Sequence, residues 1–270
     1  MNEAAKRFFI EAGQRLLDKR ADVIDFTDDE AANHLVNDLQ NYPHAFLLAC
    51  FMDRQMPARK AWMIPHEIKK RIGSFDFDAL AQLSEEQYLK HFSEPAKLHR
   101  YPAKMANYFF TAVQRIKSEY GGDASRIWRD SPSSGELIYR LLQFPGVGQK
   151  IATMTANILV RHFHVQCADK YSIDVSIDGL VPRVLKRVFG LSEAADATEL
   201  IYFARSLNPE YPGIIDYEAW DIGSNWCQPK EPQCSECRAK QICMYADKRS
   251  NNASHLPVTR GGSPEGEGGR

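Results

Sequence analysis

Apolar side chains recur at spacings of three and four residues along most of this chain. Phe8, Ala12 and Leu16 illustrate the period near the start, and the same spacing continues well past the middle of the sequence. No segment shows a convincing alternation of apolar and polar positions, which a half-buried strand would need. The pattern therefore predicts an all-α fold, with helices over residues 3–17, 28–39, 43–55, 64–72, 77–83, 85–92, 102–120, 136–143, 151–160 and 178–190.

Several of these helices have clear boundary signals. Met56-Pro57 should end the third helix near Gln55, because a residue that precedes proline disfavours the α region. Asp178 is a good N-cap and Pro182 is tolerated in a first turn, so a helix should start there and stop at Gly190. Capping alone would explain an aspartate at position 178.

The segment Phe144-Pro145-Gly146-Val147-Gly148-Gln149-Lys150 lies between two predicted helices and should form a tight hairpin. Its two glycines allow positive φ and bring bare backbone N–H groups to the start of the second helix. Such N–H groups bind phosphate. A plain helical hairpin with no ligand is the alternative.

Composition indicates a globular protein with a large core. The chain has 270 residues, of which 44% are hydrophobic, and a formal net charge of −1. No apolar run approaches a membrane span, and residues 1–20 mix charged with apolar side chains, unlike a secretory signal. We therefore expect a cytoplasmic protein with no membrane partner. Basic residues cluster after the hairpin, so a local basic face is possible despite the near-neutral total.

Four of the six cysteines, Cys227, Cys234, Cys237 and Cys243, fall within seventeen residues. A reducing cytosol disfavours disulfides, so this group predicts a metal site, and four thiolates suit either zinc or a [4Fe–4S] cluster. Cys50 lies in an apolar run and is expected in the core, while Cys167 is assigned no role.

Together these segments resemble the helix-hairpin-helix DNA glycosylases with an iron–sulfur cluster loop, the endonuclease III group in particular. The resemblance covers the hairpin, the segment 43–55, the segment 176–187 and all three cysteine intervals, and so extends over about residues 43–249. It implies two helical domains: residues 37–163 form a helical barrel with the hairpin, and residues 1–36 and 164–249 form the cluster domain. Residues 250–270 have almost no apolar content and should be a disordered tail.

The resemblance also implies roles for individual residues. Lys150 would be the nucleophile that forms a Schiff base, and Asp178 the carboxylate that stabilises a cationic sugar. Gly146, Val147, Gly148 and Gln149 would grip the DNA backbone, and Gln55 would fill the space left by an extruded base. The spacing of the four clustered cysteines favours a [4Fe–4S] cluster. Asp174 is a rival carboxylate, but the register set by Arg183 and Val184 favours Asp178.

The sequence departs from endonuclease III at some points. About ten extra residues separate Lys150 from Asp178, and Leu180 stands where that group has a histidine. Residues 176–187 are closer to the adenine-glycosylase branch, which lacks a lysine at position 150. That branch carries an extra C-terminal domain, and we expect residues 250–270 to be too few to form one.

We therefore expect a monomeric, nucleoid-associated base-excision repair glycosylase with AP lyase activity that removes a damaged or mispaired base from double-stranded DNA. The alternatives are a monofunctional mismatch or adenine-type glycosylase, a non-catalytic protein that binds DNA or abasic sites, and a helical interaction module with a structural zinc.

Overall fold

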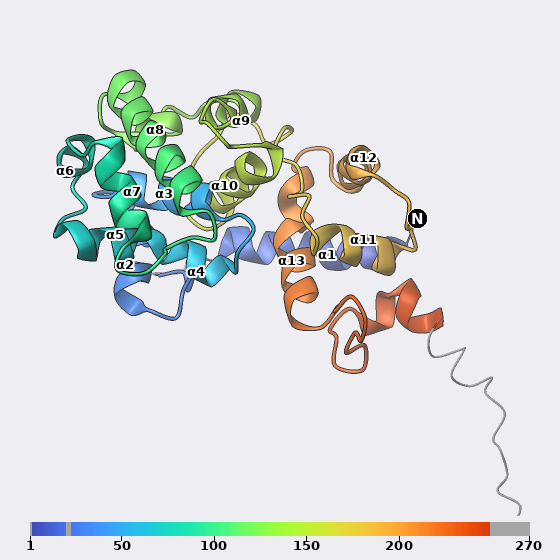
Figure 1. The fold of residues 1–270 in the computed structure, drawn as a ribbon. Coiled ribbons are helices and arrows are strands. Elements are labelled where there is room, and N and C mark those ends of the chain that lie inside the picture. The colour runs from blue at the N-terminus through green and yellow to red at the C-terminus, as the bar shows by residue number, and fades with distance from the viewer. Residues whose placement is uncertain (1, 20–22, 249–270) are drawn as a thin grey trace, which may run out of the picture.

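The computed structural model describes residues 2–19 and 23–248, and this part of the chain contains helices and no strands (Figure 1). The predicted all-α fold is confirmed. The predicted disordered tail, residues 250–270, lies outside the described residues. The α-helices are α1 (Glu3–Asp18), α2 (Glu30–Asn37), α3 (Pro43–Met52), α4 (Ala58–Trp62), α5 (Ile64–Ile72), α6 (Phe77–Ala81), α7 (Glu85–Ser93), α8 (Pro102–Tyr120), α9 (Ser134–Leu142), α10 (Gln149–Arg161), α11 (Val181–Phe189), α12 (Ala197–Leu207) and α13 (Asp216–Asn225).

Short 3₁₀ turns supplement these helices at η1 (Ala124–Ile127), η2 (Pro212–Ile215) and η3 (Lys240–Ile242). Helix α3 ends at Met52, three residues earlier than predicted, because the chain turns at Asp53 before it reaches Pro57. Helices α4, α12 and α13 were not predicted. The start of α12 did carry a sequence signal, since Asp196 and Glu199 form a capping box.

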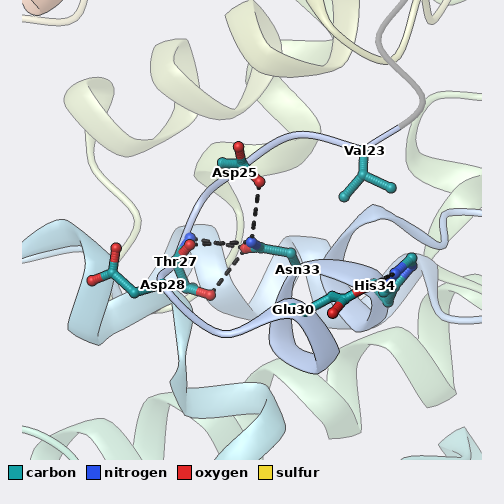
Figure 2. Close-up of a pocket in the computed structure, with 7 residues that line it drawn as sticks. All are labelled: Val23, Asp25, Thr27, Asp28, Glu30, Asn33 and His34. Atoms are coloured by element: carbon teal, nitrogen blue, oxygen red, sulfur yellow. Dashed lines mark hydrogen bonds and ion pairs between the residues drawn. The ribbon is translucent and has the colours of Figure 1, made fainter.

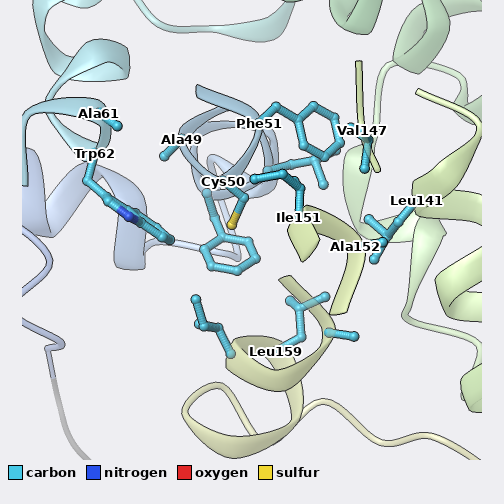
Figure 3. Packing of buried hydrophobic residues seen from close by; sticks show 14 of the residues in the cluster. Ala49, Cys50, Phe51, Ala61, Trp62, Leu141, Val147, Ile151, Ala152 and Leu159 are labelled. Atoms are coloured by element: carbon cyan, nitrogen blue, oxygen red, sulfur yellow. The ribbon is translucent and has the colours of Figure 1, made fainter. Parts of the chain in front are cut away.

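Helix α3 is the centre of the larger group of helices. All ten of its residues are buried, and its sequence is apolar on every face, as expected for a helix enclosed by others. Helices α2, α4, α5, α8 and α10 pack around it. Figure 3 shows Cys50 and Phe51 of α3 among Trp62, Val147 and Ile151, so α3 and the start of α10 share one core.

Figure 1 shows α2 to α10 gathered on one side of the molecule, with α1, α11, α12 and α13 on the other. Helix α1 packs on η2 and α13, so the start of the chain joins its last third. Helix α2 instead packs on α3 and α5. The domain boundaries at residues 37 and 163 stay a prediction. Within the described ranges, no helix is both long and apolar enough to cross a bilayer.

Candidate active site

The predicted hairpin joins α9 to α10, with Val147 buried at its tip and Gly146 and Gly148 exposed. Gly146 has φ = +80°, and a Cβ there would lie 2.4 Å from the Tyr108 ring, so both backbone and packing require glycine. Gly148 differs, because its φ is −103° and a Cβ there would meet nothing within 4 Å. It is the N-cap of α10 and has no side chain to satisfy the first N–H groups, which therefore face outward at the exposed end of the helix.

The loop after α3 is fastened to this hairpin by Arg54. The Arg54 guanidinium donates to the Gly146 carbonyl at 2.6 Å and to the Phe51 carbonyl at 3.0 Å, and it lies 5.3 Å from the centre of the Tyr108 ring. Gln55, the next residue, is exposed and has φ = +52°. The structure thus brings the exposed Gln55 and residues 146–149 to neighbouring positions, although they are far apart in sequence.

Lys150 lies in the first turn of α10 and points toward the same loop. Its Nζ is 3.5 Å from Asp53 Oδ2, 3.4 Å from the Asp53 carbonyl oxygen and 3.7 Å from Met154 Sδ. The Asp53 side chain is 12% exposed and that of Lys150 is 30% exposed, so the pair reaches solvent on the lysine side.

Asp53 is a residue whose importance the sequence pattern did not reveal. Burial raises the pKa of its carboxyl, and the adjacent Lys150 ammonium acts in the opposite direction. The Asp178 charge raises the same pKa, so Lys150 and Asp178 both interact electrostatically with Asp53. One signal was available: Asp53 is the first polar residue after the continuous apolar run that forms α3.

Asp178 lies in the turn before α11. Its Oδ1 accepts hydrogen bonds from the backbone N–H groups of Leu180 at 2.7 Å and Val181 at 3.2 Å. The helix itself begins at Val181 with Leu180 as its N-cap and without a side-chain cap bond, so the expected start is displaced by three residues and the prediction of Asp178 as the N-cap is wrong. Asp178 instead closes the turn that leads into the helix. The side chain is half-buried, and the neighbouring Gly179 has open space where a Cβ would be.

The rival carboxylate, Asp174, has a different environment. It is 4% exposed and forms a bidentate ion pair with Arg205, with N···O distances of 2.8 and 2.9 Å. Its backbone carbonyl accepts from Asn157 of α10, and two residues later the Ser176 N–H donates to the buried Asp216 carboxylate. Asp174 therefore holds the long segment after α10 in place, and this segment delivers Asp178 to the site.

Arg183 connects the Asp178 turn to the cysteine-rich loop. It donates to the Gly179 carbonyl at 2.8 Å and, across the helix pair, to the carbonyls of Cys227 at 2.6 Å and Gly223 at 3.2 Å. Arg187, one turn further along α11, donates to the Gln228 carbonyl at 2.7 Å and lies 3.3 Å from Cys227 Sγ. The cysteine-rich loop and the candidate catalytic turn are thereby held to the same helix.

Cys227, Cys234, Cys237 and Cys243 line one small cavity, with Ile222 and Trp226 on its apolar side. Burial raises the pKa of the Cys237 and Cys243 thiols. No three His, Cys, Asp or Glu side chains in the described part of the chain are grouped closely enough to hold a single metal ion. Cys50 is fully buried in the core, as expected.

A separate surface depression lies elsewhere. It has a volume of about 400 Å³ and is bordered by Asp25, Asp28 and Glu30 before and within α2 (Figure 2). Three carboxylates would repel a phosphate backbone. This depression is therefore unsuited to the partner that the hairpin would bind.

The arrangement of helices is similar to the fold of endonuclease III-like helix-hairpin-helix DNA glycosylases. A solved thermostable thymine-DNA glycosylase superposes with a TM-score of 0.61 at 17% identity, over 91% of this chain and 98% of that one. A trapped endonuclease III–DNA covalent intermediate also gives 0.61, at 15% identity, over 93% and 99% of the two chains. The expected fold relationship is confirmed.

Sequence relatives lead to the same superfamily. The thymine-DNA glycosylase of Aeropyrum pernix is 27% identical over 210 residues, which span 75% of this chain and 82% of that protein. Human adenine DNA glycosylase is 29% identical over 160 residues, 57% of this chain but only 26% of its own length. No family model matches the chain. The resemblance inferred from the motifs is thus confirmed at the level of the superfamily.

Proposed function

We propose that this protein is a DNA glycosylase of base-excision repair, and that it also cleaves the strand at the resulting abasic site by β-elimination. The observation that carries the proposal is the contact of Lys150, at the start of α10, with the buried Asp53 carboxyl. The charge of Asp178, in the turn before α11, acts on the same carboxyl. The names of the relatives support the glycosylase class. The lyase step rests on Lys150.

In the proposed reaction, double-stranded DNA with a damaged or mispaired base lies across the hairpin and the loop after α3. The uncapped start of α10 would bind a backbone phosphate through its N–H groups. Gly148 supports this, because neither its backbone angles nor its surroundings require a glycine, whereas close approach of a ligand does. Gln55, exposed beside the hairpin, would fill the gap left when the target base turns out of the stack.

Asp178 would act as a carboxylate. Its charge stabilises the cationic sugar that develops as the base departs. Lys150 would then supply the amine that attacks the sugar C1′ and forms a Schiff base, from which elimination breaks the strand. Asp178 keeps one carboxylate oxygen engaged with the backbone N–H groups of α11, which fixes its orientation.

We further propose that Cys227, Cys234, Cys237 and Cys243 hold a [4Fe–4S] cluster. The four sulfurs border one cavity, and Arg183 and Arg187 place positive charge beside the loop, which suits a cluster held by four thiolates. Bound there, the cluster would stabilise a loop with little apolar content of its own.

The lyase proposal is tested by borohydride trapping on a panel of damaged and mispaired duplexes. Wild-type protein should form a covalent adduct with at least one of them, and Lys150→Gln should form none while it still binds the same DNA. Lys104→Gln is the matched control, because Lys104 also lies beside the hairpin, 5.5 Å from the Tyr108 ring centre, but does not contact Asp53. An adduct of normal yield with Lys150→Gln would contradict the lyase assignment, and base release without any adduct would indicate the monofunctional alternative.

A further inference from the structure

The carboxyl of Asp53 is the nearest acidic group to the candidate nucleophile. Asp53 Oδ2 lies 3.5 Å from Lys150 Nζ, and the Asp53 residue is only 9% exposed. A carboxylate removed from water needs a partner, and the ammonium of Lys150 is the one ion-pair partner that the described residues provide for it. Asp178, the carboxylate of the proposed mechanism, instead directs an oxygen at the N–H groups of α11.

The position of Asp53 is fixed from several sides. Arg54, the next residue, is bonded to the hairpin through the Gly146 carbonyl, and His99 bonds to the Arg54 carbonyl at 3.0 Å. Asp53 N–H itself donates to the Cys50 carbonyl at the end of α3. The loop therefore cannot move away from α10 without the loss of these bonds, and the carboxyl stays beside Nζ.

Other ionisable groups act on this pair through their charge. The Asp178 charge, in the turn before α11, raises the pKa of Asp53, and the Arg54 guanidinium, in the loop, lowers it. The Cys50 thiol of α3 also interacts electrostatically with both members of the pair. Asp53 differs from these three groups because its carboxyl both lies within hydrogen-bond distance of Lys150 Nζ and can take up a proton.

We propose that Asp53 is the proton acceptor for Lys150, a second carboxylate of the active site whose role is separate from that of Asp178. The inference rests on the proposed function, since it assigns a step to the same nucleophile. Burial raises the pKa of Asp53 and so brings proton transfer from the ammonium closer to balance than it would be for an exposed aspartate.

Schiff-base formation starts at an abasic site whose sugar is an open-chain aldehyde. The Lys150 ammonium gives one proton to the Asp53 carboxylate, and the free amine forms the N–C1′ bond while the carbonyl π pair moves to oxygen. A proton passes from nitrogen to that oxygen and leaves a carbinolamine. Protonated Asp53 then returns its proton to the hydroxyl, water departs, and the protonated Schiff base remains beside an Asp53 carboxylate. No other reagent is consumed.

The test measures single-turnover trapping on duplexes that already contain an abasic site, with cyanoborohydride as the reductant, from about pH 6.5 to about pH 9. Asp53→Asn should trap about a hundredfold more slowly near neutral pH, the range expected for loss of a positioned base. The deficit should shrink as the pH rises, because solvent then removes the proton. Asp53→Glu, which restores a carboxylate, should recover part of the rate.

Met154→Leu is the matched control, because Met154 also contacts Nζ, at 3.7 Å, but cannot accept a proton under these conditions. It should keep the wild-type pH profile. DNA affinity and thermal unfolding of each variant separate a folding defect from a chemical one. If Asp53→Asn does not fold, the trapping rate and pH profile of Asp53→Glu provide the test instead.

Two results would overturn the inference while the proposed function stands. The first is an Asp53→Asn variant that traps as fast as wild type or faster, as expected if Asp53 only holds Lys150 as an ammonium. The second is a loss of trapping rate in Asp53→Asn that is equal at every pH. Absence of trapping by wild-type protein would instead remove the proposed lyase function, and this inference with it.

Discussion

At the scale of single residues, Asp174 and Asp178 are close in sequence but differ in their surroundings. Asp174 is buried and its two carboxylate oxygens are occupied by Arg205. Asp178 is half-buried and uses one oxygen to accept from the backbone N–H groups of the turn before α11. A carboxylate that must stabilise a developing cation needs a free oxygen and access to the substrate, and we expect Asp178 rather than Asp174 to meet both conditions.

This difference predicts opposite effects of two matched substitutions. Asp178→Asn keeps a side-chain oxygen that can accept the same backbone hydrogen bonds, so the free energy of unfolding should fall by no more than about 1 kcal/mol, whereas base excision should slow by orders of magnitude. Asp174→Asn should lower the free energy of unfolding by about 2 kcal/mol through the weakened pair with Arg205, with normal excision per folded molecule. Denaturant unfolding and single-turnover excision measure the two quantities. A large loss of stability with normal excision per folded molecule in Asp178→Asn would show that Asp178 has only a structural role.

At the level of structural elements, the hairpin between α9 and α10 contains two glycines whose structural requirements differ. Gly146 is required by the chain itself, since its φ is positive and Tyr108 fills the space of a Cβ. Gly148 has ordinary backbone angles and open surroundings. Only the second is free to serve a ligand.

Alanine at each position should therefore act on a different property. Gly146→Ala should destabilise the protein by about 2 kcal/mol, the cost of a strained left-handed residue, with a further loss from the Tyr108 contact. Gly148→Ala should change stability by less than about 0.5 kcal/mol. It should weaken DNA binding about tenfold, equal to about 1.4 kcal/mol, because its methyl group meets the approaching phosphate. Thermal unfolding and fluorescence anisotropy with duplex DNA test the pair, and unchanged affinity of Gly148→Ala would argue against phosphate contact there.

At the scale of the whole molecule, α11 connects the candidate catalytic turn with the cysteine-rich loop. Arg183 and Arg187 donate to backbone carbonyls of that loop, and Asp178 lies in the turn that leads into the same helix. The loop from Cys227 to Cys243 has few buried apolar residues of its own, among them Ala239. A bound cluster would therefore support both the loop and, through α11, the position of Asp178.

Cys234→Ser should accordingly lose cluster iron and unfold at a lower temperature than wild type. Cys167→Ser, a substitution of a cysteine outside the loop, should retain both. Iron content per chain, the visible absorbance of thiolate-bound iron and thermal unfolding supply the measurements. Full iron content and an unchanged melting temperature in Cys234→Ser would show that the ligand set is wrong.

Features that depend on neighbours along the chain could be predicted from the sequence. Helical period, caps and glycine stops define most helices, and the hairpin, the turn at Asp178 and the cysteine spacing are local patterns that the resemblance could use. Helices α4 and α13 were missed because their stability comes from packing that a single segment does not reveal, whereas α12 was missed although its capping box is a local signal.

Which of these local patterns meet depends on the packing of the helices. The packing joins the Asp53 loop to Lys150, pairs Arg205 with Asp174 and not with Asp178, and holds Gln55 beside the hairpin through Arg54. These contacts join segments far apart in sequence. Their strength depends on how deeply each residue is buried, and the spacing of apolar residues along the chain predicts burial only coarsely. Asp53 is the clearest instance: a polar residue at a helix end looks solvated in sequence, and it became the buried partner of a lysine because α10 packs against α3.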